Sequence, residues 1–517
     1  MTESSEMPNA LLPRLGVAAL VAATPALAEN PMLAPWSGPY GGVPPFDQVR
    51  VEQFVPALEA AMALELVEID AIASNEAPAD FENTIAALER SGRAFDRVTT
   101  LYGVYSSTLN TPEFQAVERE MSPKLAAFAD KITQNEALFA RIDAVWAGRE
   151  KAGLSPEQER LLWKIHNDFV RAGAKLAAAA KKRLSEINQR LATLYTQFSQ
   201  NVLADETDYV LYLEEKDLAG LPESLRSGAA AAAADRDHEG KYAILNTRSS
   251  MEPFLTYSER RDLREKVWRT YYSRGDNGDA HDNNAIVTEI LKLRAERAAL
   301  LGYRTHAHWR LENAMAKNPE RAMELLEAVW KPAVARVHQE VADMQAIAER
   351  EGAEIVIEPW DYRFYAEKVR KAKYDLDTNA VKPYLQLEKL REGMFYVAGR
   401  LFDFRFEPVS GLPVAHPDVR VWKVENAKTG ALVGLWYFDP YARPGKRSGA
   451  WMNAYRRQER FDGAVTTIVS NNSNFVKGRP GEPILISWED AETLFHEFGH
   501  ALHGLSSNVE YPTLAGT

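Results

Sequence analysis

Apolar residues in the first half of the chain recur at the spacing of amphipathic helices. Pro56 stands at a first helical position, and the series after it has intervals of three and four residues: Leu58, Met62, Leu66, Ile69 and Ala73. Three further helix starts join a capping residue to a proline: Thr111-Pro112, Ser155-Pro156 (with Gln158 completing a capping box) and Asn318-Pro319. The pattern predicts a mainly α-helical fold.

Short runs rich in β-branched and aromatic residues come late, at 419–425, 431–438 and 464–470, each bounded by turn-forming residues. They predict a small sheet. Residues 29–49 carry five prolines and are expected to lie extended over a surface. The alanine run 229–234 is expected to be a loop or linker. We place a domain boundary near residue 250, between a helical domain at 29–250 and a second domain at 251–517.

Composition excludes several classes of protein and several kinds of functional site. With 517 residues, 46% hydrophobic and 26% charged, the chain is typical of a globular protein and not of a disordered or multi-span membrane protein. The absence of cysteine excludes disulfides, thiolate zinc sites and a cysteine nucleophile. A net charge of −12 argues against nucleic acid as a partner.

The N-terminus has the features of a secretory signal peptide at residues 1–28. An apolar run at 15–23 is too short to span a membrane, and Ala-Leu-Ala at 26–28 fits a cleavage site. Glu3 and Glu6 are unusual before the apolar run, and translation from Met7 would remove both. The start codon, Met1 or Met7, therefore stays open, and the alternative is an apolar N-terminus of a cytoplasmic protein.

The most informative segment contains an H-E-x-x-H motif, His496 to His500. Ser487 and Asp490 form a capping box before it, and Gly504 is expected to end the helix. Residues four apart lie about 40° apart on one helix face, so His496 and His500 can bind one Zn²⁺. The opposite face is expected to pack into the core through Leu494, Phe498, Ala501, Leu502 and Leu505.

Glu497 follows the first histidine, so its carboxylate flanks the metal. There it can accept a proton from a zinc-activated water that attacks a peptide carbonyl, and pass it to the departing amine. Gly499 is expected to allow close approach of another backbone or of substrate. The alternative for the whole motif is a solvated helix face.

Further ligands are sought around the motif. His503 lies seven residues from His496 and is expected to support the ligands or to be solvated; Glu492 is expected to accept a hydrogen bond from an imidazole or to be exposed. A metzincin pattern would need glycine at 503 and histidine at 506, where the chain has His503 and Ser506. Only Glu510 follows as a possible carboxylate ligand, so we expect the third metal ligand to lie outside this sequence.

These residues resemble the thimet oligopeptidase family of zinc metallopeptidases, and within it the bacterial peptidyl-dipeptidases. The resemblance runs from about residue 30 to the end. It rests on five stretches: HEFGHALHGL at 496–505, FVRAGAKL at 169–176, HPDVRVW at 416–422, YAR at 441–443 with SGAWM at 448–452, and the segment 358–377.

The resemblance implies a mainly α, two-domain helical ellipsoid with a deep substrate channel and a small sheet near the zinc-binding helix. His496 and His500 carry over as ligands of one Zn²⁺ per chain and Glu497 as the general base. The family's third ligand, a glutamate, would lie past Thr517, so we interpret the sequence as C-terminally truncated or partial. In such peptidases an edge strand can hold a substrate backbone, and a purely structural sheet is the alternative.

The predicted function is release of C-terminal dipeptides from short peptides by a periplasmic or secreted zinc peptidase. One alternative is an endo-acting oligopeptidase of the same family. Another is an inactive peptide- or metal-binding fragment. The location would be cytoplasmic if residues 1–28 are not a leader, and the oligomeric state is left open.

Overall fold

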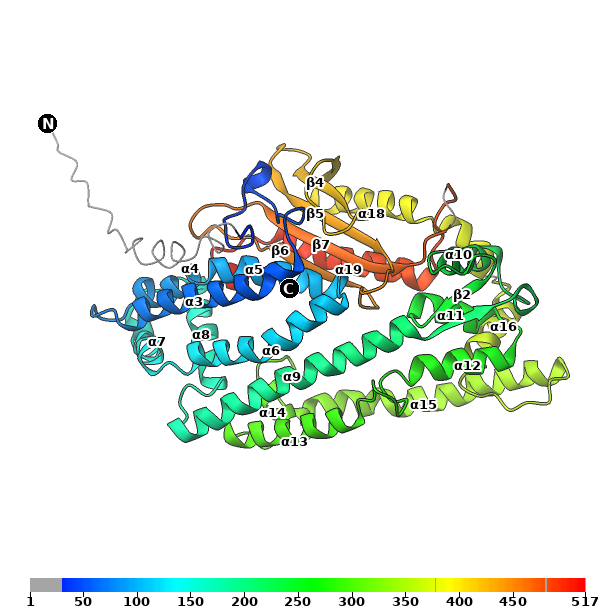
Figure 1. Cartoon of the computed structure of the whole chain (residues 1–517), viewed down its shortest axis with the longest axis horizontal. Coiled ribbons are helices and arrows are strands. Elements are labelled where there is room, and N and C mark those ends of the chain that lie inside the picture. Colours follow the sequence, from blue (N-terminus) through cyan, green and yellow to red (C-terminus); the bar gives the residue numbers. More distant parts are fainter. Residues whose placement is uncertain (1–29, 377, 479–480, 517) are drawn as a thin grey trace.

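The computed structural model describes residues 30–376, 378–478 and 481–516 (Figure 1). It is mainly helical, as the sequence predicts, with a five-stranded mixed sheet and a two-stranded sheet. The predicted leader, residues 1–28, lies outside the described residues. Within them, no helix combines the length and apolar character that crossing a bilayer requires.

Helices fill the first half of the described chain, after a 3-10 turn at Val51–Gln53. They are α3 (Phe54–Ala73), a π-helical turn (Phe81–Ala86), α4 (Ala87–Arg90), α5 (Arg93–Thr108), α6 (Pro112–Thr133), α7 (Glu136–Gly148), α8 (Pro156–Arg171) and α9 (Ala178–Asp208). Thr111 and Ser155 cap α6 and α8 as predicted, through bonds from the Phe114 and Gln158 N–H groups. Pro56 is the third residue of α3 and not the first, because the chain enters the helix from the 3-10 turn.

Two segments expected to be irregular differ from the prediction in instructive ways. Residues 30–49 form no regular element beyond a 3-10 turn at Pro39–Gly41, yet Met32, Val43 and Phe46 are buried in the core. The alanine run is not a loop: it lies in α10 (Glu223–Ala234), where Ala229, Ala232 and Ala233 are buried. Alanine has the highest helix propensity, and its small side chain permits close packing, so the run continues a helix.

A second series of helices follows β2 (Tyr242–Leu245), which pairs with β1 (Val210–Leu213) in the two-stranded sheet. It comprises α11 (Arg248–Tyr257), α12 (Arg261–Tyr272), α13 (Asn284–Leu300), α14 (His306–Leu311), α15 (Pro319–Arg350), α16 (Tyr362–Tyr374), α17 (Thr378–Val381) and α18 (Leu387–Phe402). Asn318 caps α15 as predicted. Residue 250 lies inside α11, and the domain boundary placed there stays a prediction.

The main sheet has the order β3-β4-β5-β7-β6, with β5 and β7 parallel and every other pair antiparallel. Its strands are β3 (Phe404–Val409), β4 (Arg420–Asn426), β5 (Leu432–Tyr441), β6 (Trp451–Arg456) and β7 (Thr467–Phe475). The three predicted runs correspond to β4, β5 and β7, and the prediction of a small sheet is confirmed. The edge strands β3 and β6 are short and partly polar, and so carry little β-signal.

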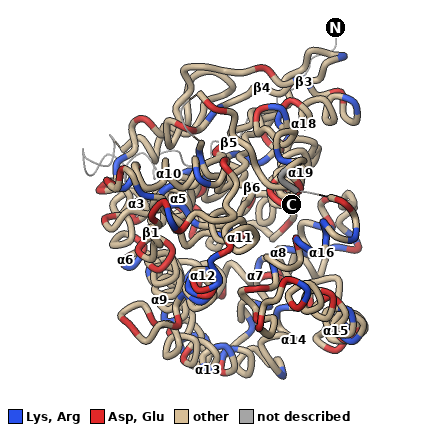
Figure 2. Tube along the Cα trace, turned by 90° about the vertical axis from the view of Figure 1, so that its right-hand side faces the viewer, with Lys and Arg blue, Asp and Glu red and all other residues tan. Residues whose placement is uncertain are grey.

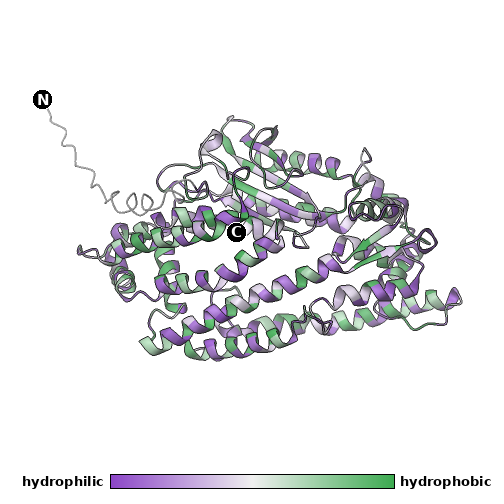
Figure 3. Ribbon diagram, in the orientation of Figure 1, coloured by the Kyte–Doolittle hydropathy of each residue, from purple (hydrophilic) through white to green (hydrophobic). Residues whose placement is uncertain are grey.

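The sheet is covered by helices on both faces. Side chains of one alternating set, including Val421, Leu435 and Tyr437, pack with residues of α3, α5 and α6. The other set, including Trp422, Trp436 and Phe438, packs with α18 and the last long helix, α19 (Trp488–Ser506). All nine residues of β7 are buried as a result. Figure 3 shows apolar and polar stripes along the long helices, and Figure 2 shows acidic and basic residues interspersed along the trace.

Candidate active site

The H-E-x-x-H motif lies on α19, which begins and packs as the sequence predicts. The Ser487 hydroxyl accepts a hydrogen bond from the Asp490 N–H, and the Asp490 carboxylate accepts one from the Ser487 N–H. Burial raises the pKa of Asp490, which these bonds and Arg248 oppose. The apolar face is inserted between the sheet and α18: Leu494, Phe498, Ala501 and Leu505 are buried, and Leu502 is partly buried.

The two histidines of the motif point their ring nitrogens at each other. The Nε2 atoms of His496 and His500 are 3.1 Å apart, and the ring planes are nearly perpendicular, at 87°. Two imidazole ligands of a tetrahedral zinc, each at about 2.0–2.1 Å, would have nitrogens about 3.3 Å apart. His496 is exposed and His500 partly so. The pair therefore has the donor atoms, spacing and accessibility of a metal site.

Glu497 lies on the same helix but is only 9% exposed. Its backbone carbonyl accepts a hydrogen bond of 2.6 Å from Asn471 Nδ2 on β7, and Asn471 Oδ1 accepts one of 2.6 Å from Trp436 Nε1 on β5. A chain of two hydrogen bonds thus joins the middle of the sheet to the centre of the motif. Sequence reasoning missed Asn471, because an asparagine in a strand gives no signal of a contact with a distant helix.

The two glycines of α19 have different surroundings, and one expectation was wrong. The helix does not end at Gly504 but continues to Ser506, because Gly504 is buried against the sheet. A Cβ there would lie 2.9 Å from Met452 Cε and 3.1 Å from Val469 Cγ1. Gly499, by contrast, faces open space among the described residues, so no other backbone approaches it. Close approach of a substrate at Gly499 stays a prediction.

The remaining candidates lie around the histidine pair. Glu492 and His503 are exposed. Glu510 lies beyond the helix, its N–H bonded to Glu157 and its carboxylate 3.9 Å from Arg460. Within the described residues, no third His, Asp or Glu forms a metal-binding group with His496 and His500.

The connection from β5 to the edge strand β6 is anchored by a buried ion cluster that sequence reasoning also missed. Arg443 binds the Asp439 carboxylate through two hydrogen bonds of 2.7 Å, and Lys446 donates to the Asp439 and Tyr441 carbonyls at 2.9 Å. Burial opposes ionisation of Asp439, but bonds from Arg443 and the charge of Lys446 hold its pKa below the usual value. Burial lowers the pKa of Lys446 to about 8. The cluster fixes the chain that leads into β6.

A cavity of about 420 Å³ borders β6, between this strand and α5. Its lining includes Gly103 and Ser107 of α5, Trp451 and Asn453 of β6, and Arg447 of the loop before β6. Met452 of the same strand lies against Gly504, one turn beyond His500. The edge strand thus lies between an open cavity and the helix that carries the motif.

Comparison with known proteins adds independent findings. The profile of Peptidase family M3 matches residues 254–517. The chain is 39% identical over 490 residues to dipeptidyl carboxypeptidase of Escherichia coli strain K12, a match that covers 94% of this chain and 72% of that protein. It is 31% identical over 494 residues to oligopeptidase A of Salmonella typhimurium strain LT2, covering 94% and 72% respectively. It is 32% identical over 516 residues to the chloroplastic/mitochondrial organellar oligopeptidase A of Arabidopsis thaliana, covering 95% and 63%.

Proposed function

This chain belongs to peptidase family M3 and is by that membership a peptidase, and on this premise we propose how it works. It hydrolyses short peptides, with zinc held by His496 and His500 and with Glu497 as the general base. The observation that carries the proposal is the 3.1 Å approach of the two Nε2 atoms beside a mostly buried glutamate. Two solvated histidines would gain at most one hydrogen bond from this approach, whereas a metal ion would use the lone pairs of both nitrogens.

The donor set fits zinc. Two imidazole nitrogens on one helix turn are borderline-soft ligands at the correct separation, and the chain has no cysteine to compete for the metal. When bound, zinc would supply Lewis-acid chemistry, polarising a peptide carbonyl and acidifying water. His496 and His500 would hold the zinc ion and fix its position, and they transfer no proton.

Glu497 is the group that moves the proton. Its carboxylate accepts a proton from the attacking water and delivers it to the amine nitrogen as the peptide bond breaks. Such a base must be held in place, and the hydrogen bond from Asn471 to the Glu497 carbonyl fixes its backbone against the sheet. The low exposure of Glu497 limits its contact with bulk water.

The edge strand β6 is the proposed binding surface for the peptide. Among the described strands, β6 pairs only with β7, so the N–H and C=O groups of its other edge can pair with an extended substrate. The 420 Å³ cavity lies between this strand and α5. The anchored β5–β6 connection holds the start of β6 in place, and Met452 of this strand lies against Gly504 of α19. Pairing with β6 requires an extended backbone, which short, unstructured peptides supply.

We further propose release of C-terminal dipeptides, because identity to the dipeptidyl carboxypeptidase (39%) exceeds identity to oligopeptidase A (31%). Dipeptide release requires recognition of a free carboxylate. A peptide with a free C-terminus should therefore be shortened by two residues at a time, while its C-terminally amidated form should be cleaved far more slowly. Equal cleavage of both forms at internal bonds would instead assign an endo-acting oligopeptidase.

Export to the periplasm is proposed from the leader sequence. Expressed in a Gram-negative host, the mature protein should begin at Glu29 and be released by osmotic shock. Recovery of residues 1–28 intact on a cytoplasmic protein would contradict export while leaving the peptidase assignment untouched.

A further inference from the structure

A second cluster of potential metal ligands lies far along the chain from the H-E-x-x-H motif. Asp205, at the end of α9, meets Asp279 and His281 of the loop between α12 and α13. One ligand atom from each residue lies within 4.8 Å of the other two. Nothing in the proposed peptidase mechanism uses these three side chains.

Asp205 is the strongest indication that the cluster has a ligand. Its side chain has an exposed fraction of 0%, and its Oδ2 accepts bonds from the Gly275 N–H at 2.7 Å and from Asn277 Nδ2 at 3.0 Å. Its Oδ1, equally buried, has no hydrogen-bond partner, and His281 Nδ1 lies 3.6 Å away. A buried carboxylate oxygen without a partner is costly, so a cation at this oxygen would remove a penalty.

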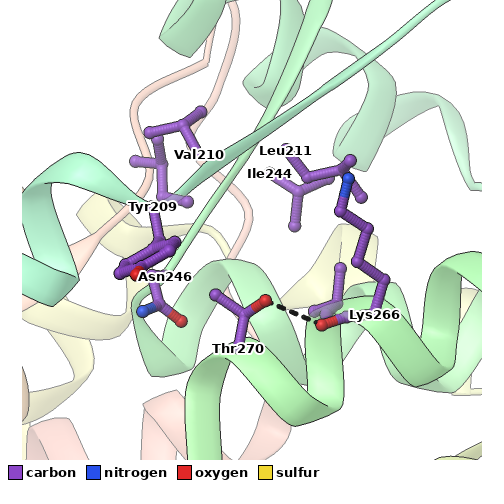
Figure 4. Close-up of a pocket in the computed structure, with 9 residues that line it drawn as sticks. Tyr209, Val210, Leu211, Ile244, Asn246, Lys266 and Thr270 are labelled. Carbon is purple, nitrogen blue, oxygen red and sulfur yellow. Dashed lines mark hydrogen bonds between the residues drawn. The ribbon is translucent and has the colours of Figure 1, made fainter. Parts of the chain in front are cut away.

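The surrounding residues hold the other ligands in place. The Tyr209 hydroxyl donates to Asp279 Oδ2 at 2.9 Å, and the His281 N–H donates to Asp279 Oδ1 at 2.8 Å. The Tyr209 ring lines a small cavity of about 60 Å³ beside β1 and β2, together with Asn246 (Figure 4). Asn246 Nδ2 in turn donates to the Asp205 carbonyl at 3.0 Å. Both carboxylates are thus positioned by polar contacts that do not involve Asp205 Oδ1 or His281 Nδ1.

We propose that Asp205, Asp279 and His281 bind a divalent first-row transition-metal ion such as Mn²⁺ or Zn²⁺. Two carboxylates neutralise the charge of such an ion, and the imidazole favours a transition metal over Ca²⁺ or Mg²⁺, which prefer oxygen ligands. Around an ion with bonds of about 2.0–2.2 Å, ligand atoms lie about 3–4.4 Å from one another, which the cluster reaches with small side-chain rotations.

The site would connect two parts of the fold. Glu206, next to Asp205 on α9, accepts hydrogen bonds from Arg274 and from Ser448, and Ser448 precedes the edge strand β6. A metal ion at Asp205 would therefore join the end of α9 to the α12–α13 loop. This junction lies next to Glu206, through which α9 contacts the β5–β6 connection. Its role is structural, with no part in peptide hydrolysis.

The test uses the whole chain with the first site removed. In a His496→Ala/His500→Ala double variant, equilibrium dialysis against Mn²⁺ or Zn²⁺, followed by metal analysis, should find one ion per chain, and the ion should raise Tm. Adding His281→Ala should abolish both effects. Adding His338→Ala instead, an exposed histidine on α15, should change neither. His281 is 37% exposed in its side chain, so its removal is compatible with folding, which circular dichroism checks.

Two results would overturn the proposal. One is the absence of bound Mn²⁺ and Zn²⁺ from a folded double variant, which would leave a direct contact between His281 and Asp205 in place of a metal site. The other is metal binding that survives His281→Ala, whether the dialysis uses Mn²⁺, Zn²⁺ or Ca²⁺. Asp205→Asn supplies a second check, because the amide keeps an acceptor for the Gly275 N–H but loses the charge at Oδ1.

Discussion

The Nε2 atoms of His496 and His500 lie 3.1 Å apart across one turn of α19, with their rings almost perpendicular. Two imidazoles that share no metal gain at most one hydrogen bond from this arrangement, since one nitrogen must donate and the other accept. A shared metal ion uses both lone pairs at once. The relationship therefore supports the proposed metal site.

Removing either His496 or His500 should remove the zinc proposed to bind this pair. His500→Ala leaves one imidazole at the site, so the chain should bind about one equivalent less zinc than the wild type, with the Asp205 cluster keeping its ion, and peptidase activity should be lost. The matched control is His503→Ala, an exposed histidine on the same helix, which should keep both zinc and most of the activity. Metal analysis of the two dialysed variants measures the difference. Loss of zinc from His503→Ala would show that His503 is a zinc ligand.

Asn471 should matter for both stability and turnover. Asn471→Ala leaves Trp436 Nε1 without its acceptor in a buried site and frees the Glu497 carbonyl, so the free energy of unfolding should fall by about 1–3 kcal/mol. Turnover should fall while zinc is retained, because the ligands are untouched. Asn508→Ala, at an exposed position, is the control. Urea unfolding and metal content together check this; unchanged turnover would limit Asn471 to a stabilising role.

The two glycines of α19 provide a matched pair. Gly504→Ala places a methyl group 2.9 Å from Met452 Cε, which can move aside, and 3.1 Å from Val469 Cγ1 on the buried strand β7, which has little room to move. The contact with Val469 should lower the free energy of unfolding by about 1 kcal/mol or more. Gly499→Ala meets open space and should raise it by up to about 1 kcal/mol through helix propensity. Chemical denaturation of both variants measures the difference, and equal effects would contradict the packing of α19 on β6 and β7.

Glu65 should make stability depend on pH. Burial, with the nearby charges of Asp96 and Glu68, raises its pKa from 4.5 to about 7. Between these two pKa values, Glu65 is protonated in the folded protein but ionised in the unfolded chain. The free energy of unfolding therefore falls as the pH rises through this window. Glu65→Gln removes the charge and should raise Tm relative to the wild type at about pH 8 but much less at about pH 4. Glu52→Gln, at an exposed position, is the control, and a pH-independent gain would contradict the shift.

The sequence predicted the elements whose signals are local. The capping boxes at Ser155 and Ser487 and the apolar face of α19 depend on residues within one or two turns, and the structure has them where the spacing places them. The alanine run was misjudged because composition alone does not separate a linker from a tightly packed helix. Gly504 was misjudged because its neighbours, Met452 and Val469, are distant in sequence.

The least predictable element was the polar half of β7. Asparagine is disfavoured in strands, yet Asn471, Asn472 and Asn474 are buried there. Their side chains donate to carbonyl groups of Glu497, Trp451, Arg447 and Gly449, which lie on α19 and on the path into β6. Such contacts exist only in the folded chain, so neither propensity nor periodicity can anticipate them.

The role of Glu497 is the central claim, and one comparison tests it most directly. Glu497→Gln keeps both histidines and nearly the same shape, so the variant should hold zinc as the active wild-type enzyme does. Its kcat/KM for a peptide with a free C-terminus should nevertheless fall by about 10²–10⁴-fold, the usual cost of losing a general base. Glu492→Gln, exposed on the same helix, should retain near-normal turnover. A zinc-loaded Glu497→Gln enzyme with wild-type kcat/KM would contradict the account.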